Sequence, residues 1–168
     1  MKATNEKPMT YSCKTMKSPV GLLKLVASSR GLAAILWEND DPHRVQLGRL
    51  VEDRDHPVLL EAERQLADYF AGTRRTFSVN FDFIGTDFQK AVWRALAAIP
   101  FGETRSYAQI AAQIGRPKAV RAVGAAIGRN PISIVVPCHR VIGSNGKLTG
   151  FAGGMETKAS LLRLESEK

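Results

Sequence analysis

Residues Ser106–Gly128, SYAQIAAQIGRPKAVRAVGAAIG, decide the fold of this chain. Ser106 and Gln109 have the spacing of a capping box, in which each side chain accepts a hydrogen bond from the other residue's backbone N–H. A helix is therefore expected to begin here, with an inner face of Tyr107, Ile110, Ala111 and Ile114. Gly115 would end this helix, because glycine adopts the left-handed conformation of a helix C-terminus at little cost.

A second short helix is predicted directly after this glycine. Pro117 suits the first position of a helix because it has no N–H to leave unpaired. The inner face of the second helix would be Val120, Val123, Gly124 and Ile127. Two short helices joined by a glycine turn predict a helix-turn-helix, whose second helix enters a groove of DNA.

Most helical hairpins of this kind bind no DNA, so the composition of the second helix matters. Cations suited to phosphate contacts lie on its outer face or beside it: Lys118, Arg121 and Arg129. Small residues would let the helix approach a groove closely: Ala122, Gly124, Ala125 and Gly128. Together they favour nucleic acid as the partner.

The net charge lies almost entirely in the half of the chain that holds this motif. Residues 1–84 contain 12 Lys and Arg against 11 Asp and Glu, a net of +1, whereas residues 85–168 contain 12 against 5, a net of +7. Such a surplus indicates a polyanionic partner, with a merely solvated surface as the alternative.

The flanking sequence predicts the rest of a C-terminal domain, residues 85–168. Upstream, Thr86 and Gln89 form another capping box before an apolar helix that stops at Pro100. The elements expected downstream are a buried strand, a β-hairpin around an Asn-Gly turn, a glycine-rich loop and a last helix, at 132–136, 141–148, 149–154 and 156–165. A hairpin behind a helix-turn-helix is a wing, so a winged helix-turn-helix is expected.

Residues 1–84 predict a separate small α/β domain, so the whole chain is expected to be α+β. Apolar segments between turn-forming residues predict an antiparallel meander at 11–17, 22–27 and 32–37. Residues 39–57 are charged and lack a period, which predicts a loop, and 58–71 have helical spacing. A last strand is predicted from the alternating residues Phe77, Val79, Phe81 and Phe83.

The composition, 44% hydrophobic and 24% charged, is that of a soluble globular protein. No stretch reaches about 18 uninterrupted apolar residues, and Met1–Thr10 has no apolar leader, so we expect no membrane segment and a cytoplasmic location. Cys13 and Cys138 are too few for a disulfide framework, and the cytosol would keep both as thiols.

Cys138 is the candidate nucleophile. A buried cysteine is commonly inert, and that interpretation is adopted for Cys13, which has no adjacent histidine or cationic cluster. Cys138 instead lies between Pro137 and His139, and His139 and Arg140 are expected to stabilise its thiolate, the nucleophilic form.

His139 is expected to act on the sulfur of Cys138 through a water molecule. Adjacent residues of a regular strand point to opposite faces, so the two side chains would not touch. Either the chain turns sharply at Pro137 or a water carries the proton, and the water is the favoured hypothesis. A carboxylate should orient the imidazole, and the second half of the chain offers Asp87, Glu103, Glu156, Glu165 and Glu167.

No metal or cofactor is predicted. The possible zinc ligands show no C-x₂₋₄-C or H-x₃₋₅-H spacing: Cys13, His43, His56, Cys138 and His139. The glycines between 143 and 154 match neither of the two phosphate-loop patterns.

The chain resembles the O6-alkylguanine-DNA alkyltransferases, also called methylated-DNA–protein-cysteine methyltransferases. The resemblance rests on Arg121-Ala122-Val123-Gly124, Asn130-Pro131, Pro137-Cys138-His139-Arg140-Val141 and Gly153-Gly154. It runs without gaps from about Phe88 to Glu165, while the first half agrees in layout with the family's small ribonuclease-H-like domain. Zinc ligands of some relatives fall here on Met9 and Ser28, so the resemblance implies no metal.

This resemblance implies DNA repair by direct reversal. Cys138 would take the alkyl group from O6 of a damaged guanine, and also from O4 of a damaged thymine, in a flipped-out base. By likeness, His139 is the base that acts through water, Glu165 orients it, and Asn130 ties the active-site strand to the helix-turn-helix. An alkyl thioether has no carbonyl for water to attack, so the protein would be a suicide enzyme that acts once.

The resemblance also implies how DNA is held. Arg121 would enter the base stack in place of the extruded base, Tyr107 would swing the nucleotide and bond the guanine edge, and the carbonyls of Cys138 and Val141 would accept from the guanine amino group. The other expected contacts are Ala122, Gly124, Ile127, Ser144, Phe151 and Ala152. The recognition helix would enter the minor groove of double-stranded DNA, single-stranded DNA would also bind, and the protein would be a monomer, with clustering along DNA as a further expectation.

Two positions depart from the commoner family pattern. Phe151 stands where many members have tyrosine, and Ala152 where some have serine, so no hydroxyl contact to O6 is expected there. The backbone N–H of Ala152 remains a possible donor.

Two other functions fit parts of the sequence. A transcription regulator or non-repairing damage binder would use the same helix-turn-helix, but such binders lack the cysteine of this motif. A cysteine hydrolase would need an oxyanion hole and no basic face.

Overall fold

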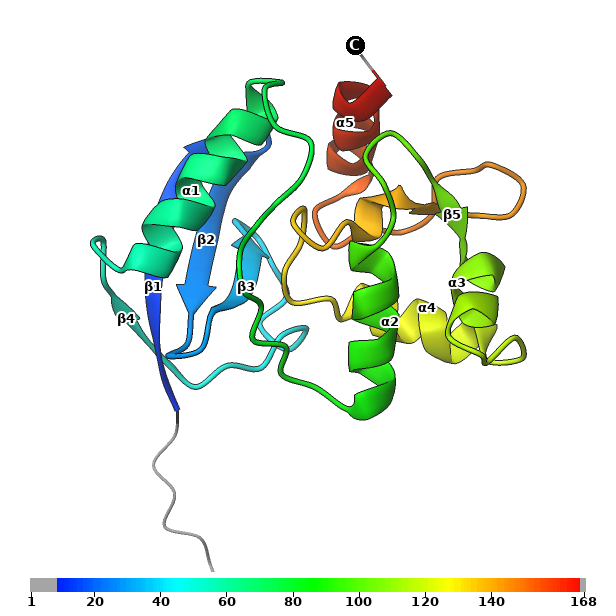
Figure 1. The fold of residues 1–168 in the computed structure, drawn as a ribbon, viewed down its shortest axis with the longest axis horizontal. Helices are drawn as coiled ribbons and strands as arrows, with labels where there is room; N and C mark the ends of the chain where they lie inside the picture. Colours follow the sequence, from blue (N-terminus) through cyan, green and yellow to red (C-terminus); the bar gives the residue numbers. More distant parts are fainter. Residues whose placement is uncertain (1–8, 167–168) are drawn as a thin grey trace, which may run out of the picture.

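The computed structural model describes residues 9–166. A four-stranded sheet with one helix against it forms the N-terminal part, and a group of helices lies beside it, as Figure 1 shows. The architecture is mixed α and β, as expected.

The sheet contains β1 (Thr10–Ser18), β2 (Gly21–Ala27), β3 (Leu32–Trp37) and β4 (Arg49–Glu52), in the order β3-β2-β1-β4. The first three strands pair antiparallel, which confirms the predicted meander. The fourth strand was not predicted. It pairs parallel to β1 at the edge, where its largely exposed residues leave no hydrophobic periodicity to detect.

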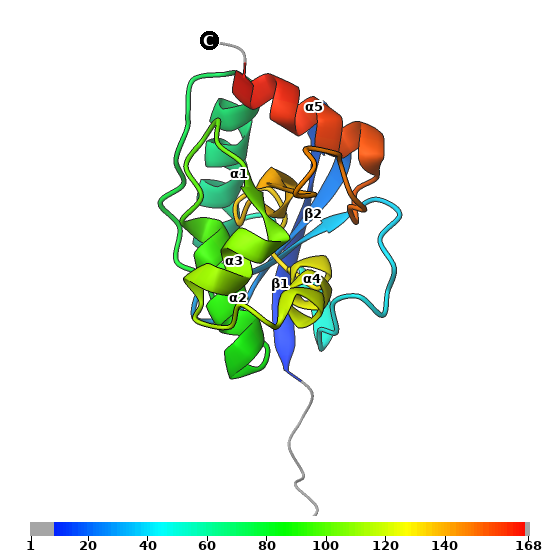
Figure 2. The same ribbon diagram turned by 90° about the vertical axis from the view of Figure 1, so that its right-hand side faces the viewer.

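The two faces of the sheet are covered differently. Helix α1 (Pro57–Phe70) packs its buried residues Leu59, Ala62, Gln65, Leu66 and Tyr69 toward one face. The segment 38–48 lies on the other side of the sheet in Figure 2, and its Val45 and Leu47 pack against a buried cluster that includes Val26 and Ala34. The predicted helix is confirmed to within a residue at each end.

The predicted strand at 77–83 is wrong. Only Phe81 forms an isolated bridge, to Leu32, so the segment makes no ladder. Its alternation reflects packing instead: Phe83 contacts Phe81 and Trp93, with ring centroids 5.3 and 5.6 Å apart. Apolar alternation shows which side chains face inward, but a strand also needs a partner along its length.

Three helices follow: α2 (Asp87–Ala97), α3 (Tyr107–Gln113) and α4 (Val120–Gly128). Both predicted capping boxes are present, at Thr86 and at Ser106. The helices pack on one another, with α3 and α4 forming the predicted helix pair.

The role assigned to Pro117 is wrong, because α4 begins after Ala119. The N–H of Arg116 bonds the carbonyl of Ala111 at 2.9 Å, and Gly115 has a φ of 76°. This is the Schellman arrangement that closes a helix, after which proline is common because it cannot continue the helix. Pro117 therefore follows the end of α3 rather than starting α4.

The segment 132–136 is buried as predicted, but it is not a strand. The N–H of Val136 bonds the carbonyl of Ile132 at 2.9 Å, and Ile134 has a φ of 72°, which a β-branched residue rarely adopts. A single bridge, between Ile35 and Ile132, links the segment to β3. The chain therefore approaches Cys138 through a strained turn.

The predicted β-hairpin at 141–148 is also wrong. Strand β6 (Val141–Ile142) pairs parallel with β5 (Arg105–Ser106), not with Leu148. The Asn-Gly turn is present, since the N–H of Gly143 bonds the carbonyl of Lys147 at 2.9 Å, but only a loop follows. Among the residues that are described, the expected wing is thus a loop. The last helix, α5 (Met155–Ser166), is as predicted.

One apolar core joins the two halves. It contains Leu25 and Ile35 from the sheet, Leu59 from α1, Val92 from α2 and Val123 from α4. The sheet and the helices therefore hold each other in a defined relation, which matters for the site between them. Across residues 9–166, no helix has the length and apolar character needed to cross a membrane.

Candidate active site

Cys138 is the first residue of a 3₁₀ helix, η1 (Cys138–Arg140), and is 7% exposed. The expectation that Cys138 and His139 lie on a regular strand is therefore wrong. The sharp turn at Pro137, the less favoured alternative, is what the chain adopts. Because the two residues lie in a 3₁₀ helix, the alternating faces of a strand do not separate their side chains.

Cys138 opens onto a pocket of about 180 Å³. The lining comes from five parts of the chain and consists of Arg44, Tyr107, Gly124, Ile127, Gly128, Cys138, Gly150, Phe151 and Ala152. Six of these residues were expected in the site: Tyr107, Gly124, Ile127, Cys138, Phe151 and Ala152. A larger cavity of about 720 Å³ lies beside the N-terminal sheet, but it includes neither Cys138 nor His139, so the smaller pocket is the candidate site.

A buried network surrounds the carboxylate of Glu165 in α5. Its Oε2 accepts from Tyr69 at 2.6 Å and from Nη2 of Arg140 at 2.9 Å, and it lies 2.7 Å from Nε2 of His139. Its Oε1 accepts from Nε of Arg140 at 2.7 Å. Of the four acidic candidates that the structure describes in the second half of the chain, Glu165 is thus the one beside the imidazole, and the fifth, Glu167, lies outside the described residues.

These donors keep Glu165 ionised. Burial by itself would raise the pKa of the carboxyl group, but hydrogen bonds from His139, Arg140 and Tyr69 outweigh burial and hold the pKa at about 2. Burial and the neighbouring carboxylate raise the pKa of Tyr69, so its hydroxyl stays a donor.

The state of His139 follows from this carboxylate. Burial lowers the pKa of the imidazole and outweighs the opposing effect of Glu165, so the ring is neutral near pH 7. An ionised carboxylate only accepts, which places the proton of the ring on Nε2. Nδ1 then carries a lone pair, and this buried atom has no hydrogen-bond partner within residues 9–166. His139 therefore presents an unoccupied base.

Cys138 is a thiol at rest. Burial raises its pKa, while the amide of Asn130 and the cations of Arg44 and Lys158 lower it. The expectation that His139 and Arg140 stabilise the thiolate is wrong in this respect. His139 is neutral, and the guanidinium of Arg140 is engaged by Glu165 and by the carbonyl of Ile99 at 2.6 Å. A base is therefore needed to remove the proton.

Asn130 connects the end of α4 to the segment that leads to Cys138. Its Nδ2 donates to the carbonyl of Val136 at 2.8 Å, and its Oδ1 accepts from the N–H of Ile132 at 3.1 Å. Its own carbonyl accepts from Nη1 of Arg44 at 2.7 Å, and Arg44 is held in turn by Asp40. The side chain thus links the end of α4 to the segment before Cys138, which was expected to be a strand and is instead a strained turn.

A second network fixes the opposite wall of the pocket. The hydroxyl of Tyr107 lies 2.5 Å from Oγ1 of Thr149, and the buried ammonium of Lys158 donates to the carbonyl of Val141 at 2.6 Å and to both oxygens of Thr149 at 3.3 Å. Lys158 was not predicted as a site residue. Its sequence neighbours in a helix give no sign that an ammonium group would be 1% exposed.

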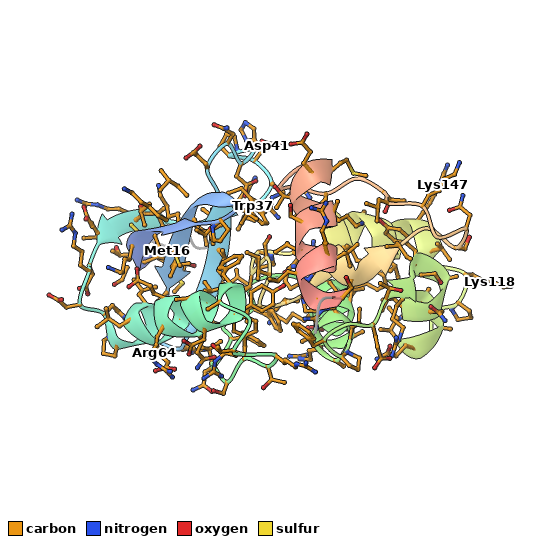
Figure 3. The ribbon with its side chains drawn as sticks, turned by 90° about the horizontal axis from the view of Figure 1, so that it is seen from above. Met16, Trp37, Asp41, Arg64, Lys118 and Lys147 are labelled. Carbon is orange, nitrogen blue, oxygen red and sulfur yellow. The ribbon has the colours of Figure 1, made fainter. Side chains whose placement is uncertain are left out.

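The remaining expected contacts lie outside the pocket. Val141 is buried beneath it, whereas Arg121, Ala122 and Ser144 are exposed on α4 and on the loop after β6. Within the described chain Arg121 has no ion-pair or hydrogen-bond partner, so its guanidinium is available to a ligand. Figure 3 shows Lys118 and Lys147, both exposed, at the end of the molecule far from Met16.

The sequence matches two family models, one for each half. Residues 11–83 match the ribonuclease-like domain of 6-O-methylguanine DNA methyltransferase, and residues 87–167 match its DNA binding domain. The chain belongs to this methyltransferase family. It therefore repairs DNA by direct reversal, through transfer of an alkyl group to a cysteine, and the family resemblance seen in the sequence is confirmed.

Named members of the family are similar along nearly the whole chain. The methylated-DNA–protein-cysteine methyltransferase of Methanosarcina mazei is 48% identical over 150 residues, which cover 89% of this chain and 94% of that protein. The Mycobacterium leprae protein of the same name is 46% identical over 156 residues, 93% of each chain. The Mycobacterium tuberculosis OGT, solved in complex with DNA, superposes with a TM-score of 0.84 at 46% identity, covering 94% of this chain and 92% of that one.

The methyltransferase site also contains residues that sequence reasoning missed. Tyr69 and Arg44 come from the N-terminal half, 96 and 86 residues away from their partners Glu165 and Asn130. Nothing local marks them, because a tyrosine in an amphipathic helix and an arginine in a charged loop are ordinary.

Proposed function

We propose that Cys138 is the acceptor of the alkyl group and that His139 activates it. The observation that carries this proposal is the buried, unpartnered Nδ1 of a neutral imidazole whose other nitrogen is held by an ionised carboxylate. A water bonded to Nδ1 would relay the proton of the Cys138 thiol, as general-base catalysis permits. Glu165 would stabilise the imidazolium that forms.

The transfer is a displacement at carbon. The thiolate of Cys138 attacks the alkyl carbon, an S–C bond forms, and the C–O6 bond breaks with its electron pair left on the guanine oxygen. The proton that left the thiol ends on the guanine, which is restored. The same pocket would accept O4-alkylthymine, because the scissile bond is chemically equivalent.

The lesion would be bound as an extruded base. Tyr107 would bond the guanine edge, Ile127 and Phe151 would contact the ring, and the N–H of Ala152 would donate to O6. The carbonyls of Cys138 and Val141 each accept one hydrogen bond already, from the N–H of Val141 and from Lys158. A carbonyl oxygen has two lone pairs, so each can also accept from the guanine amino group.

DNA would be held by α4 in the minor groove. Arg121 would take the place of the flipped base in the stack, while Ala122 and Gly124 would allow close approach. The loop 143–150, with Ser144, would serve where a wing is expected. Single-stranded DNA would bind the same surface, and the protein would act as a monomer, with clustering along DNA as a further prediction.

Two predictions from the sequence accompany this proposal. Residues 1–84 and 85–168 would be the two domains, with the site in the second. The cytoplasmic location also stays a prediction.

Adduct mapping tests the proposal. The protein is incubated with a duplex containing O6-methylguanine, digested and analysed by mass spectrometry. We expect a gain of about 14 Da, one methyl replacing one hydrogen, on the peptide of Cys138, retained indefinitely. A methyl group on Cys13, or many equivalents of repaired duplex per protein molecule, would contradict the proposal.

A further inference from the structure

Trp37, the last residue of β3, lies at the boundary between the N-terminal sheet and the active-site loop. The side chain is 7% exposed, and its Nε1 donates to Oγ of Ser133 at 3.2 Å. Its backbone N–H donates to Oδ2 of Asp40 at 3.2 Å. Figure 3 shows Trp37 on the side of the sheet that faces the C-terminal half. Hydrogen bonds thus hold Trp37 both at its backbone and at its indole nitrogen.

The ring of Trp37 packs against the loop that carries the pocket wall. Its centroid lies 5.4 Å from that of Phe151, at an interplanar angle of 70°, the edge-on geometry that aromatic pairs favour. A Cβ atom added to Gly153 would lie 2.7 Å from Cε2 of Trp37 and 2.9 Å from Cε2 of Phe151. The loop therefore packs directly against the indole, with no space for a further carbon atom at Gly153.

Phe151 in turn lines the pocket beside Cys138. The N–H of Gly154 bonds the carbonyl of Phe151 at 2.9 Å, so the loop closes on itself at this point. The indole lies against the phenyl ring and blocks its movement in that direction. An indole behind a pocket wall limits the width of that pocket, since protein interiors are close-packed and yield little.

We propose that Trp37 is a specificity-determining residue that limits the size of the alkyl group accepted by Cys138. The proposal rests on the assignment of Cys138 and its pocket as the site of transfer. The indole touches no reacting atom in this scheme. It sets the position of Phe151, and through it the space available to the group on O6.

The test compares two lesions in one duplex sequence. Single-turnover rate constants are measured for O6-methylguanine and O6-benzylguanine with the wild-type protein and with Trp37→Leu. A smaller side chain leaves space into which Phe151 can move. We expect the ratio of benzyl to methyl rates to rise roughly tenfold, the effect of about one methylene in an apolar pocket. An unchanged ratio would overturn the proposal, even if both rates fall.

Loss of stability must be separated from this effect. Trp93→Leu is the matched control, because Trp93 is also buried, at 2% exposure, and bonds a carbonyl, but its ring contacts Phe83 and not Phe151. We expect Trp93→Leu to lower the melting temperature without raising the ratio of rates. A rise equal to that of Trp37→Leu would show that loosening anywhere has this effect and would overturn the proposal.

Gly153→Ala tests the same contact by adding a methyl group instead of removing part of a side chain. The new methyl group would meet the indole and press on Phe151, so we expect slower transfer, most of all for benzyl. In the Trp37→Leu background the same change should cost little, and the two effects should be non-additive. Additive effects would contradict the proposed contact. A wild-type protein that transfers neither group to Cys138 would instead contradict the proposed function.

Discussion

The N-terminal sheet and the C-terminal helices contribute to the same site in different ways. Residues 85–168 carry a net charge of +7, the helix pair and the reactive Cys138, whereas residues 1–84 carry +1 and no chemical motif. Yet Tyr69 and Arg44 of the first half bond Glu165 and the carbonyl of Asn130 directly. One half supplies the reacting groups, and the other holds them in place.

The largest effect should come from the nucleophile. Cys138→Ser replaces a thiol with a hydroxyl, which is far less acidic and less nucleophilic, so alkyl transfer should be abolished. Binding of undamaged duplex, measured by fluorescence anisotropy, should be unchanged. Cys13→Ser in β1 is the control and should retain the full rate. Loss of transfer in Cys13→Ser instead would reverse the assignment of the two cysteines.

A smaller but still large loss is expected from Glu165→Gln. The amide keeps the shape of the side chain but cannot stabilise an imidazolium at His139, so the single-turnover rate should fall roughly 10²-fold, a typical contribution of general-base catalysis. The adduct should still form on Cys138 at long times. A rate equal to that of the wild type would contradict the role of Glu165 in stabilising the imidazolium.

Arg121→Ala should separate DNA handling from chemistry. Repair of O6-methylguanine in duplex DNA should slow about tenfold, in line with the loss of one specific contact. Reaction with free O6-benzylguanine should be nearly unaffected, because the exposed guanidinium lies outside the pocket. Lys147→Ala, another exposed cation in this half, offers a comparison for loss of charge alone. Equal losses on both substrates would contradict the role of Arg121 in the stack.

The smallest effect should come from a substitution in residues 1–84, which hold the reacting groups in place. Tyr69→Phe removes one donor from Glu165 and leaves His139 and Arg140, so we expect a loss of about 2 kcal/mol in the free energy of unfolding, as for a hydrogen bond to a charged group. Transfer should slow less than in Glu165→Gln. Urea titrations and single-turnover rates provide the two measurements.

The pH dependence of Tyr69→Phe sharpens this prediction. Since the pKa of Glu165 is about 2 in the folded protein, below its value of about 4.3 in an unfolded chain, its contribution to stability is present above about pH 4.3 and is lost as the pH falls toward 2. Without the Tyr69 donor the folded pKa rises, so acid unfolding should begin at a higher pH. An unchanged acid transition would show that Tyr69 does not stabilise the carboxylate.

Local signals predicted local structure well. The capping boxes at Thr86 and Ser106 and the apolar stripe of α1 each concern residues within a few positions of one another, and all are present. The errors occurred where structure depends on a distant partner. The segments 77–83 and 132–136 have apolar patterns suited to strands, but neither finds a strand to pair with along its length.

In the candidate site, too, residues close in the sequence could be predicted and residues from distant segments could not. Cys138, His139 and Asn130 are close in sequence, so their residue types and spacing pointed to a nucleophile and its support. The carboxylate could be narrowed only to five residues, and likeness to a family was needed to prefer Glu165. The cations that act on the thiol, Arg44 and Lys158, could not be chosen at all, because a contact between residues distant in the sequence leaves no local pattern.

The order of residues alone was enough to establish the family, the helix pair and the reactive cysteine, since these depend on short-range chemistry. Folding in three dimensions settled the rest: it turned the chain at Pro137, left Nδ1 of His139 unpaired, and placed Trp37 behind Phe151. The physical reason is that protonation states and pocket width depend on burial and on neighbours within a few ångströms, which come from distant parts of the chain.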